Sequence, residues 1–481
     1  MVTFLVGVAI LLLGYFGYSR FMIWLFRPDD RLTPAIANPD GVDRLPLPLW
    51  KNALIQLLNI AGVGPVIGVI LGIKFGAIVF LILPIGNVIG GAVHDYFSGM
   101  ISVRHNGANT PELVRHYLGV KVSHAYTWFL ALTLLLVGAV FITIPAGIIA
   151  DGNNKVYWLV AVLVFIYYFV ATFFPVDKII GRIYPLFGSL LILSSVAVIV
   201  ALIPHMGLLE EVDFSQALNR HPNHEPIIPM LFVTIACGII SGFHSTQSPI
   251  IARTITSEHQ GRVAFYGMMI VEGLIGMIWA AGGMAIYAHN EALRASGNGT
   301  MILRELVSWL LGPVGGRVAL AGVIVLAITS GDTALRSLRL AMADYFGIDQ
   351  RPTGKRLATV VPIFAAVAVL LAWSNADPNG FKSLWNYFAW SNQTIAVCAL
   401  LVAAVWLGWN GRCAYIWVAL LPGAFMLYVI ITYILWVSPT NLAGAPIGFG
   451  LDYHLSLGLA AVITAITTLL IWRKAQPKNS H

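Results

Sequence analysis

The segment SGFHSTQSPIIAR, residues 241–253, interrupts a mostly apolar run that begins at Ile227. Its six residues from Phe243 to Ser248 carry one aromatic ring, one imidazole, three hydroxyl groups and one amide. What these groups do depends on the surroundings that the rest of the chain provides.

The composition places the chain in a membrane. Of its 481 residues, 58% are hydrophobic and only 10% are charged, whereas soluble proteins average about 25% charged residues. Apolar runs reach the length of a transmembrane helix and lack the alternation of barrel strands. The first run, 2–26, has no basic leader and is too long for a signal peptide. We therefore predict an all-α polytopic protein of the cell (inner) membrane whose first helix is retained.

The apolar runs predict about thirteen transmembrane helices in a single domain, 1–481. Their expected ranges are 3–24, 51–73, 76–102, 122–147, 156–174, 179–203, 227–254, 262–288, 316–345, 356–373, 382–408, 413–437 and 453–472. Two shorter segments are expected to lie at the surface: 109–119, with Thr110 as N-cap and Pro111 at the first helical position, and 300–312.

The basic residues predict the direction of the helices. Most of the 28 Lys and Arg residues fall in alternate connections on one side, which the positive-inside rule assigns to the cytoplasm. The N-terminus is then outside and the C-terminus cytoplasmic. Topology explains the positive net charge without a nucleic-acid partner. The other side carries Lys74, Lys155, Arg220, Arg294, Arg304, Arg317 and Lys382.

A second interruption matches the first. LLNIAGVGPVIG, 57–68, places Gly62, Gly64 and Pro65 in the middle of the second helix, where glycine loosens a helix and proline removes a donor. The second half of each helix is expected to begin at proline, at Pro65 and at Pro249. The two helices are five apart and run in opposite directions, which is typical of an inverted repeat. Simple kinks are the alternative.

Two matched breaks favour a binding site between them. Backbone groups freed in mid-membrane must line a cavity or find partners. The half-helix starts at 64–66 and 248–250 present N–H groups and positive dipole ends. We expect the site to take something small, polar and anionic.

Five motifs resemble the carbon starvation protein A (CstA) family. They are NIAGVGPVIG (59–68), GGAVHDYFSGM (90–100), ISGFHSTQSPIIAR (240–253), AITSGDTALRSLRLAMADYF (327–346) and YFAWSNQTIA (387–396). The resemblance implies a secondary transporter of the amino acid–polyamine–organocation superfamily. Members are associated with uptake of peptides, or of pyruvate with protons, when nutrients are limiting.

The same resemblance implies a leucine-transporter-type core of five plus five helices. One helix, 3–24, would precede a first repeat at 51–203 and a second at 227–408, and two helices, 413–472, would follow. No cofactor is expected; the expected partners are a small-molecule substrate, a coupling ion and the lipid bilayer.

The candidate substrate-binding residues lie at the two breaks and in the motif WSNQ. They are Asn59, Gly62, Gly64, Phe243, His244, Ser245, Thr246, Gln247, Ser248, Trp390, Asn392 and Gln393. His244 could instead satisfy carbonyls freed by the break, and Trp390 could pack at the membrane interface.

Ionisable side chains within spans are costly and mark candidate coupling sites. Asp332 lies among hydroxyl groups that could coordinate a cation beside the first break, a place where the five-plus-five fold commonly holds sodium. Its alternative is a structural pair with Arg336, one helical turn away. Glu272 could carry a proton or bond a neighbouring helix. The full set is Thr329, Ser330, Asp332, Thr333 and Glu272.

A third group suggests a gate. His94 and Asp95 lie in the inner half of their helix near Arg104, so a cytoplasmic gate or a packing network is as reasonable as contact with substrate. A metal site from His94, Asp95 and His244 has no ligand-spacing signature, and none is predicted.

These patterns predict a secondary active importer of a small carboxylate or short peptide, driven by protons or sodium through alternating access. A channel is the first alternative, although no charge ring or filter-like loop is visible. A membrane-embedded enzyme or sensor is the second, although the chain shows no nucleophile–base pair and no soluble signalling domain. No ATP-binding motif points to a primary pump.

Overall fold

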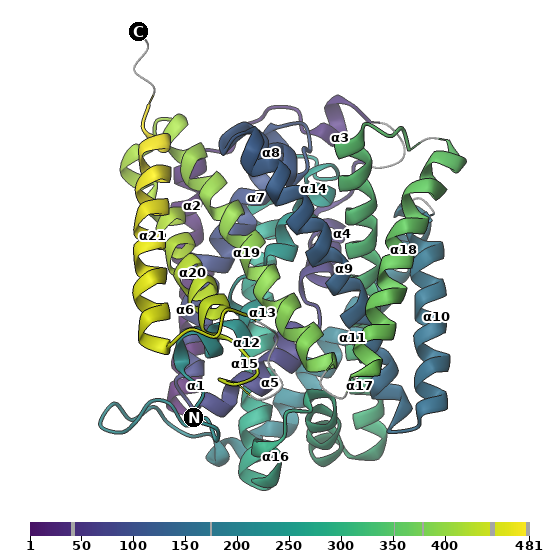
Figure 1. Cartoon of the computed structure of the whole chain (residues 1–481), viewed down its shortest axis with the longest axis vertical. Helices are drawn as coiled ribbons and strands as arrows, with labels where there is room; N and C mark the ends of the chain where they lie inside the picture. The colour runs from purple at the N-terminus through teal and green to yellow at the C-terminus, as the bar shows by residue number, and fades with distance from the viewer. Residues whose placement is uncertain (40–43, 174–175, 351, 378–379, 443–447, 478–481) are drawn as a thin grey trace.

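The computed structural model describes residues 1–39, 44–173, 176–350, 352–377, 380–442 and 448–477, without the side chains of 176–187. The described residues form helices and connecting turns, with no β-strand among them (Figure 1). Turns wound more tightly or more loosely than an α-helix are labelled η.

The helices fall into three groups along the chain. The leading group is α1 (Val2–Leu13), η1 (Gly14–Tyr18), α2 (Ser19–Phe26) and α3 (Pro34–Ala37). The next is α4 (Leu49–Ile60), η2 (Gly64–Gly68), α5 (Val69–Gly72), η3 (Ile73–Phe75), α6 (Val79–Gly86), η4 (Asn87–Gly91), α7 (Ala92–Arg104), α8 (Thr110–Tyr117), α9 (Val120–Ala150), α10 (Asn154–Phe173), α11 (Val176–Leu202) and η5 (Ile203–Leu208). The last is η6 (Ile227–Leu231), α12 (Phe232–Thr234), α13 (Ala236–Ile239), α14 (Gly242–Ala252), η7 (Glu258–Gln260), η8 (Arg262–Gly267), α15 (Met268–His289), α16 (Ala292–Ala295), α17 (Gly299–Phe346), α18 (Thr353–Ala376), α19 (Gly380–Trp409), η9 (Cys413–Tyr415), α20 (Trp417–Trp436) and α21 (Tyr453–Ala475).

Eleven helices of the described part are long and apolar enough to cross a membrane, or twelve if the bent pair Leu49–Ile60 and Gly64–Phe75 is one span. The remaining predicted span, 227–254, is divided into pieces too short to cross alone. The all-α polytopic class is confirmed, while the count of thirteen and the five-plus-five repeat stay predictions. The segment 300–312 is helical and joins the next span at Gly312, a non-helical residue within α17.

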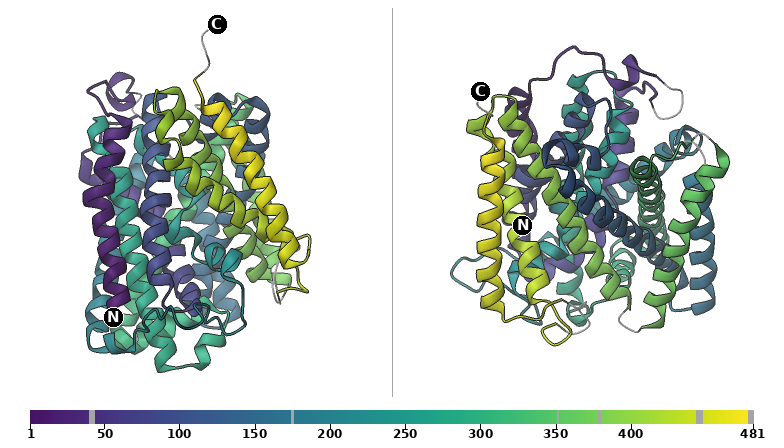
Figure 2. Two further views of the ribbon diagram at one scale, coloured as in Figure 1. Left: turned by 90° about the vertical axis from the view of Figure 1, so that its left-hand side faces the viewer. Right: turned by 45° about the horizontal axis from the view of Figure 1, so that its top comes forward.

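The helices stand side by side, and their ends define two faces. The N-terminus lies at the lower face and the C-terminus at the upper face in Figure 1. Helices α20 and α21 flank one side of the bundle, and α10 and α18 flank the other (Figures 1 and 2). These flanking helices carry many exposed apolar side chains, as lipid contact requires. The helices between them enclose the polar residues discussed below.

The first break falls where the sequence predicts it. α4 ends at Ile60, Ala61–Val63 leave the helix, and η2 begins at Gly64 with Pro65 in its first turn. The two halves of this span are bent by 57°. Proline cannot donate to the preceding turn, so it starts a helix more readily than it continues one.

The helix that follows the second break begins seven residues before Pro249, its predicted start. α13 ends at Ile239, Ile240 and Ser241 are extended, and α14 begins at Gly242 and runs through Pro249. The expected half-helix start at 248–250 is therefore wrong. The backbone N–H of Phe243 donates to Asn392 Oδ1 at 2.7 Å, so a side chain of α19 caps the helix at this point. A distant residue, invisible to local sequence patterns, decides where α14 starts.

Glycine allows the two broken helices to touch. A Cβ atom on Gly64 would overlap the Cβ of Cys237 in α13, so η2 and α13 lie side by side. A Cβ on Gly242 would overlap the backbone carbonyl of Asn392. The expectation that the two breaks are neighbours is confirmed.

The surface segment 109–119 forms α8 with a different cap from the one expected. Asn109 occupies the N-cap position, and Thr110 is the first helical residue. The buried Thr110 hydroxyl instead donates to the Ser245 carbonyl at 2.6 Å. Thr110 therefore fastens α8 to α14.

Candidate functional site

Four ionisable side chains meet at the second break. His94 and Asp95 come from α7, His244 from α14 and Glu272 from α15. Asp95 lies 2.8 Å from His94 Nδ1 and 3.1 Å from His244 Nδ1. The other ring nitrogen of His244 faces Glu272 Oε2 at 3.7 Å. We call these four residues the His/Asp/Glu cluster.

The cluster is buried in the bundle, and among the described residues no Lys or Arg forms an ion pair with its carboxyl groups. Each of its side chains is at most 1% exposed. Among the described residues, Asp95 and Glu272 form close ionic contacts only with histidines. His244 Nε2 and both Glu272 oxygens have no hydrogen-bond partner within the described part of the chain. Buried groups of this kind normally find a partner, so this region is suited to protons, water or a polar ligand.

Close packing of α7 brings the cluster together. A Cβ on Gly91 would overlap the carbonyl oxygen of Ile239, and one on Gly99 would overlap the Phe265 ring. Gly91, the last residue of η4, therefore allows close contact with the second broken span, and Gly99 of α7 allows close contact with η8. The sequence placed His94 and Asp95 near a gate with Arg104, but the structure joins them to His244 instead.

Arg104 belongs to a separate ion pair. Its guanidinium donates to both oxygens of Glu258, each at 3.0 Å, and lies over the Phe26 ring. Glu258 is buried and also accepts from the Asp29 backbone N–H. Sequence reasoning missed Glu258 because it lies in a connection, where an acidic residue is ordinary. The grouping of Arg104 with His94 and Asp95 as one gate stays a prediction that these contacts do not support.

The residues of α14 point in different directions. Ser245, Thr246 and Ser248 bond back to carbonyls one turn earlier in their own region, those of Gly242, Phe243 and His244. The Gln247 amide donates to Thr246 Oγ1 and, across the interface, to Ser337 of α17 at 3.4 Å. His244 alone among these α14 residues belongs to the His/Asp/Glu cluster. The predicted α14 residues therefore do not form one binding surface.

The candidates on α19 also separate. Asn392 joins the break itself, since its amide donates to Ser241 Oγ at 2.9 Å while its oxygen accepts from Phe243. Trp390 donates to the Ile430 carbonyl of α20, and Gln393 donates to the Phe232 carbonyl. Asn392 is thus a helix cap, whereas Trp390 and Gln393 turn toward other partners.

The first break faces the motif TSGDT of α17. Thr333 Oγ1 donates to Asn59 Oδ1 at 3.2 Å, and a Cβ on Gly62 would lie 3.3 Å from Ser330 Oγ. Thr329, the remaining hydroxyl of the motif, bonds back to Val325 and Leu326 within α17. The predicted neighbourhood of TSGDT and the first break is therefore present.

Asp332 has the partner that the structural alternative requires. One of its oxygens lies 3.5 Å from Arg336, and the other accepts from Tyr167 of α10 at 3.5 Å. Asp332 and Arg336 are both buried. Tyr167 could not have been found from the sequence, because nothing local connects it to α17.

Two cavities lie toward opposite faces of the bundle. A cavity of about 240 Å³ reaches from the N-terminal face to η2, where Ile67 lines it, and to Thr234 of α12. A much smaller one, about 20 Å³, lies toward the other face beside Thr246 and α8. No set of three or more His, Cys, Asp or Glu side chains in the described part of the chain is placed to hold a metal ion.

The helical bundle, its two adjacent breaks and its buried polar centre define a multi-pass membrane transporter. The chain matches the family described as Carbon starvation protein CstA over residues 1–164, 153–305 and 295–433, and it belongs to that family.

Three bacterial proteins are similar to this chain. The chain is 27% identical to a peptide transporter CstA of Bacillus subtilis, over 97% of this chain and 94% of the relative. It is 24% identical to the pyruvate/proton symporter BtsT of Escherichia coli, over 88% and 79% of the two chains. An uncharacterized membrane protein of Haemophilus influenzae is 39% identical over 61% of this chain and 93% of the relative.

Solved structures show a similar fold. A manganese transporter of Eremococcus coleocola aligns with 91% of this chain and 99% of its own, with a TM-score of 0.55. The sequence identity is 14%, so this likeness concerns the fold alone. The proteins named here are described as transporters or, for the Haemophilus influenzae relative, as a membrane protein.

Proposed function

We propose that the protein is a secondary active importer in the cell (inner) membrane that takes up a small carboxylate or short peptide together with protons. The N-terminal face is outside in this proposal, as the distribution of Lys and Arg predicts. The observation that carries the proposal is the buried His/Asp/Glu cluster at the second break.

Proton coupling follows from the chemistry of the cluster. Two carboxyl groups and two imidazoles can hold different numbers of protons, and each proton changes the net charge by one. Because charge is costly in a low-dielectric interior, the cluster favours protonation states close to neutral. An anion that arrives beside it makes one further proton favourable, and binding energies are linked reciprocally. Substrate and proton would therefore bind together.

The adjacent half-helices support an anionic group on the substrate. The segment Gly64–Phe75 and α14 both begin near the middle of the bundle. Their first turns direct positive dipole ends toward the region between the breaks. The matched peptide transporter and pyruvate/proton symporter both have names consistent with substrates that carry a carboxylate.

A sodium-coupled importer is the second candidate, and a specific contact favours it. Asn59 and Thr333 bond across the first break, and the Ser330 hydroxyl is adjacent. Oxygen ligands of this kind suit a hard cation. The Asp332–Arg336 ion pair argues against it, since the only carboxylate in the motif already lies beside a cation.

Uptake into proteoliposomes tests the proposal. Purified protein is reconstituted, and entry of labelled pyruvate and of labelled dialanine is followed under an imposed proton gradient or an imposed sodium gradient. We expect accumulation of at least one of them under the proton gradient and not under the sodium gradient alone. Accumulation that requires sodium would favour the second candidate, and fluxes at channel rates without accumulation would overturn both.

A further inference from the structure

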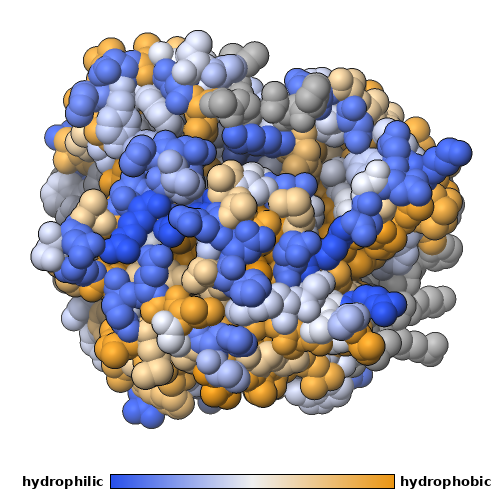
Figure 3. Space-filling view, turned by 90° about the horizontal axis from the view of Figure 1, so that it is seen from below, coloured by the Kyte–Doolittle hydropathy of each residue, from blue (hydrophilic) through white to orange (hydrophobic). Residues whose placement is uncertain are grey.

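The cavity on the N-terminal face lies between four segments of the chain. The half-helix Gly64–Phe75, the connection before η6, the start of α17 and the start of α19 form its walls. Seen from below, hydrophilic side chains gather in a band across this face with hydrophobic ones around them (Figure 3). The cavity therefore opens from a polar surface into the apolar bundle.

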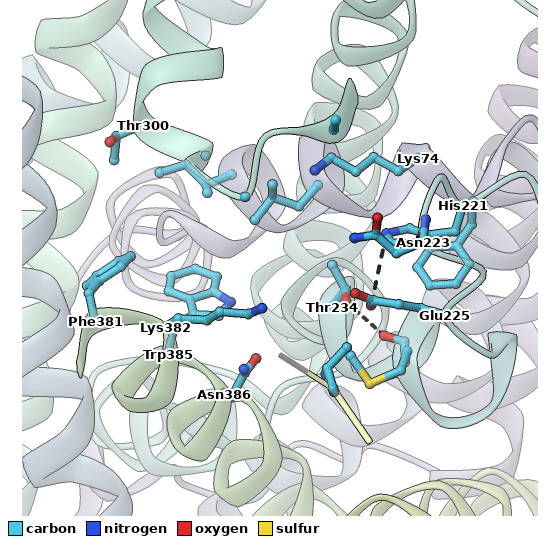
Figure 4. A pocket seen from close by; sticks show the side chains of 18 residues that line it. Lys74, His221, Asn223, Glu225, Thr234, Thr300, Phe381, Lys382, Trp385 and Asn386 are labelled. Carbon is cyan, nitrogen blue, oxygen red and sulfur yellow. Dashed lines mark hydrogen bonds and ion pairs between the residues drawn. The ribbon is translucent and has the colours of Figure 1, made fainter. Parts of the chain in front are cut away.

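Two lysines provide positive charge in this cavity. Lys74, at the end of the half-helix, is only 5% exposed, and its ammonium donates to the Ser296 carbonyl. Lys382 lies at the exposed start of α19. Figure 4 shows both ammonium ends directed into the cavity from opposite sides. A buried ammonium with a neutral carbonyl partner is well placed to receive an anion.

The other titratable groups of the cavity offset this charge only in part. Burial, with help from the nearby Lys74 ammonium, lowers the pKa of His221 to about 4, so its ring is neutral at pH 7. Glu225 is the one carboxyl group among the described residues of the lining, and burial raises its pKa. Among the described lining residues, the two lysines therefore outnumber the single carboxyl group.

The remaining surface suits a small organic solute more than an inorganic ion. Phe75, Phe381 and Trp385 present aromatic rings, and Asn223, Asn386 and Thr300 offer neutral hydrogen-bonding groups. The volume of about 240 Å³ exceeds that of several waters, at about 30 Å³ each. Apolar walls with a few convergent polar groups are typical of ligand sites.

The cavity leads toward the first break. Ile67 lies three residues after Gly64, where the half-helix begins, and Thr234 belongs to the broken span opposite. A solute in the cavity would therefore already touch both broken spans before it reached the His/Asp/Glu cluster.

We propose that this cavity is a vestibule site that binds the free carboxylate of a small organic solute between Lys74 and Lys382. The inference rests on the proposed function for the direction of transport, whereas binding in the vestibule can be measured without it. The lysines attract and hold the carboxylate group, and the aromatic walls receive the rest of the solute.

Calorimetric binding to the full-length protein in detergent tests the site. The probes are pyruvate, dialanine and the neutral methyl ester of pyruvate, and the variants are Lys382→Gln, Lys74→Gln, Lys382→Arg and Lys155→Gln. Lys155 is an exposed lysine in the first turn of α10 and does not line the cavity. It therefore controls for the same loss of charge elsewhere on the surface.

We expect Lys382→Gln to raise the Kd for the two carboxylates by about three- to tenfold, less than a fully buried charged hydrogen bond would give because this lysine is exposed. Lys382→Arg should retain most of the affinity, Lys155→Gln should match the parent, and the methyl ester should bind equally to all forms. Pyruvate and dialanine together show whether the rest of the solute is a ketone or a peptide. Unchanged carboxylate affinity in Lys382→Gln and in folded Lys74→Gln would overturn the vestibule.

Uptake separates this inference from the proposed function. If Lys382→Gln raises KM and leaves the maximal rate of proton-driven uptake intact, both stand. If proton-driven uptake is present but its KM is unchanged by substitution of Lys382 or Lys74, the vestibule proposal is wrong and the proposed function stands. If carboxylate binding depends on Lys382 but no proton-driven uptake is found, the vestibule proposal stands and the proposed function is wrong.

Discussion

The two breaks look alike in the sequence and differ in the chemistry that surrounds them. The first break, at Ala61–Val63, faces the Asn59–Thr333 hydrogen bond and the Ser330 hydroxyl, while the Asp332–Arg336 ion pair of the same motif contacts α10. The second, at Ile240–Ser241, lies beside the His/Asp/Glu cluster. Glycine permits close packing at both, but only the second is next to carboxyl groups whose charge no Lys or Arg of the described chain balances at close range.

This difference assigns different tasks to the two breaks. A buried guanidinium favours the charged form of a neighbouring carboxylate, because arginine stays protonated. A carboxylate beside imidazole can share or release a proton, because histidine titrates near neutral pH. The ion pair near the first break is therefore suited to a structural role. The His/Asp/Glu cluster at the second break is suited to gaining and losing protons during transport.

The largest effect is expected at the second break. Glu272→Gln removes a proton acceptor and keeps the shape of the side chain, so accumulation driven by a proton gradient should fall to background. Exchange of labelled for unlabelled substrate should survive, since exchange requires no net proton movement. Both are measured in proteoliposomes. Glu305→Gln, at an exposed position of α17, is the matched control and should behave like the parent. Accumulation by Glu272→Gln at the parental rate would remove Glu272 from coupling.

At the first break the expected effect is on stability. Asp332→Asn takes the charged partner from buried Arg336, and breaking a buried ion pair on one side costs about 3–5 kcal/mol. The free energy of unfolding in mixed micelles measures this loss. The double variant Asp332→Asn with Arg336→Gln should recover part of the stability and retain proton-driven accumulation. A single variant that is as stable as the parent yet cannot accumulate substrate would show that Asp332 carries the coupling ion.

Glycine substitutions compare the packing of the two breaks. Gly242→Ala places a methyl group against the Asn392 backbone, which cannot move aside, whereas Gly64→Ala meets the Cys237 side chain. Overpacking costs about 1–3 kcal/mol, and we expect the upper end for Gly242→Ala. Thermal unfolding in detergent gives the order of the two variants.

A second substitution sharpens this test. Cys237→Gly removes the atoms that Gly64→Ala would meet, so the double variant should regain stability that Gly64→Ala loses. No side-chain change can relieve Gly242→Ala in this way. Equal costs for both glycines, or no rescue by Cys237→Gly, would contradict the packing described for η2 and α13.

The smallest expected effect concerns the cap of α14. Asn392→Ala removes the acceptor of the Phe243 N–H and should cost about 0.5–2 kcal/mol of unfolding free energy. Asn392→Asp keeps the acceptor and should cost less in the same unfolding measurement. If both variants lose equal stability, the amide donor to Ser241 matters more than the cap.

Much of the fold could be predicted because it follows from local composition. Long apolar runs define helices that must satisfy their own backbone in lipid, and twelve of the predicted spans correspond to helices or to the bent pair. Gly64 and Pro65 mark the first break directly, because proline starts a helix where glycine has loosened one. The second break was misplaced because its position depends on Asn392, about 150 residues away in the chain.

The candidate site could also be predicted only in part from the sequence. The sequence identifies His244, Asp95, His94 and Glu272 as unusual, because ionisable groups are rare within apolar spans. It does not say that they meet, nor that Asp332 lies beside Arg336 and Tyr167, nor that Trp390 and Gln393 turn away. Those outcomes depend on which helices are neighbours, and neighbours are chosen by packing over the whole bundle.

By itself, then, the sequence determined that this chain is a helical membrane transporter with two interrupted spans, because hydrophobicity, glycine and proline act over a few residues at a time. Only the tertiary structure decided which polar groups share a charge. His244 is joined to Asp95 and Glu272, and Arg104 is joined to Glu258, through contacts between residues distant in sequence. Electrostatic partnership is a matter of a few ångströms in space, and the order of residues along a chain does not encode that distance directly.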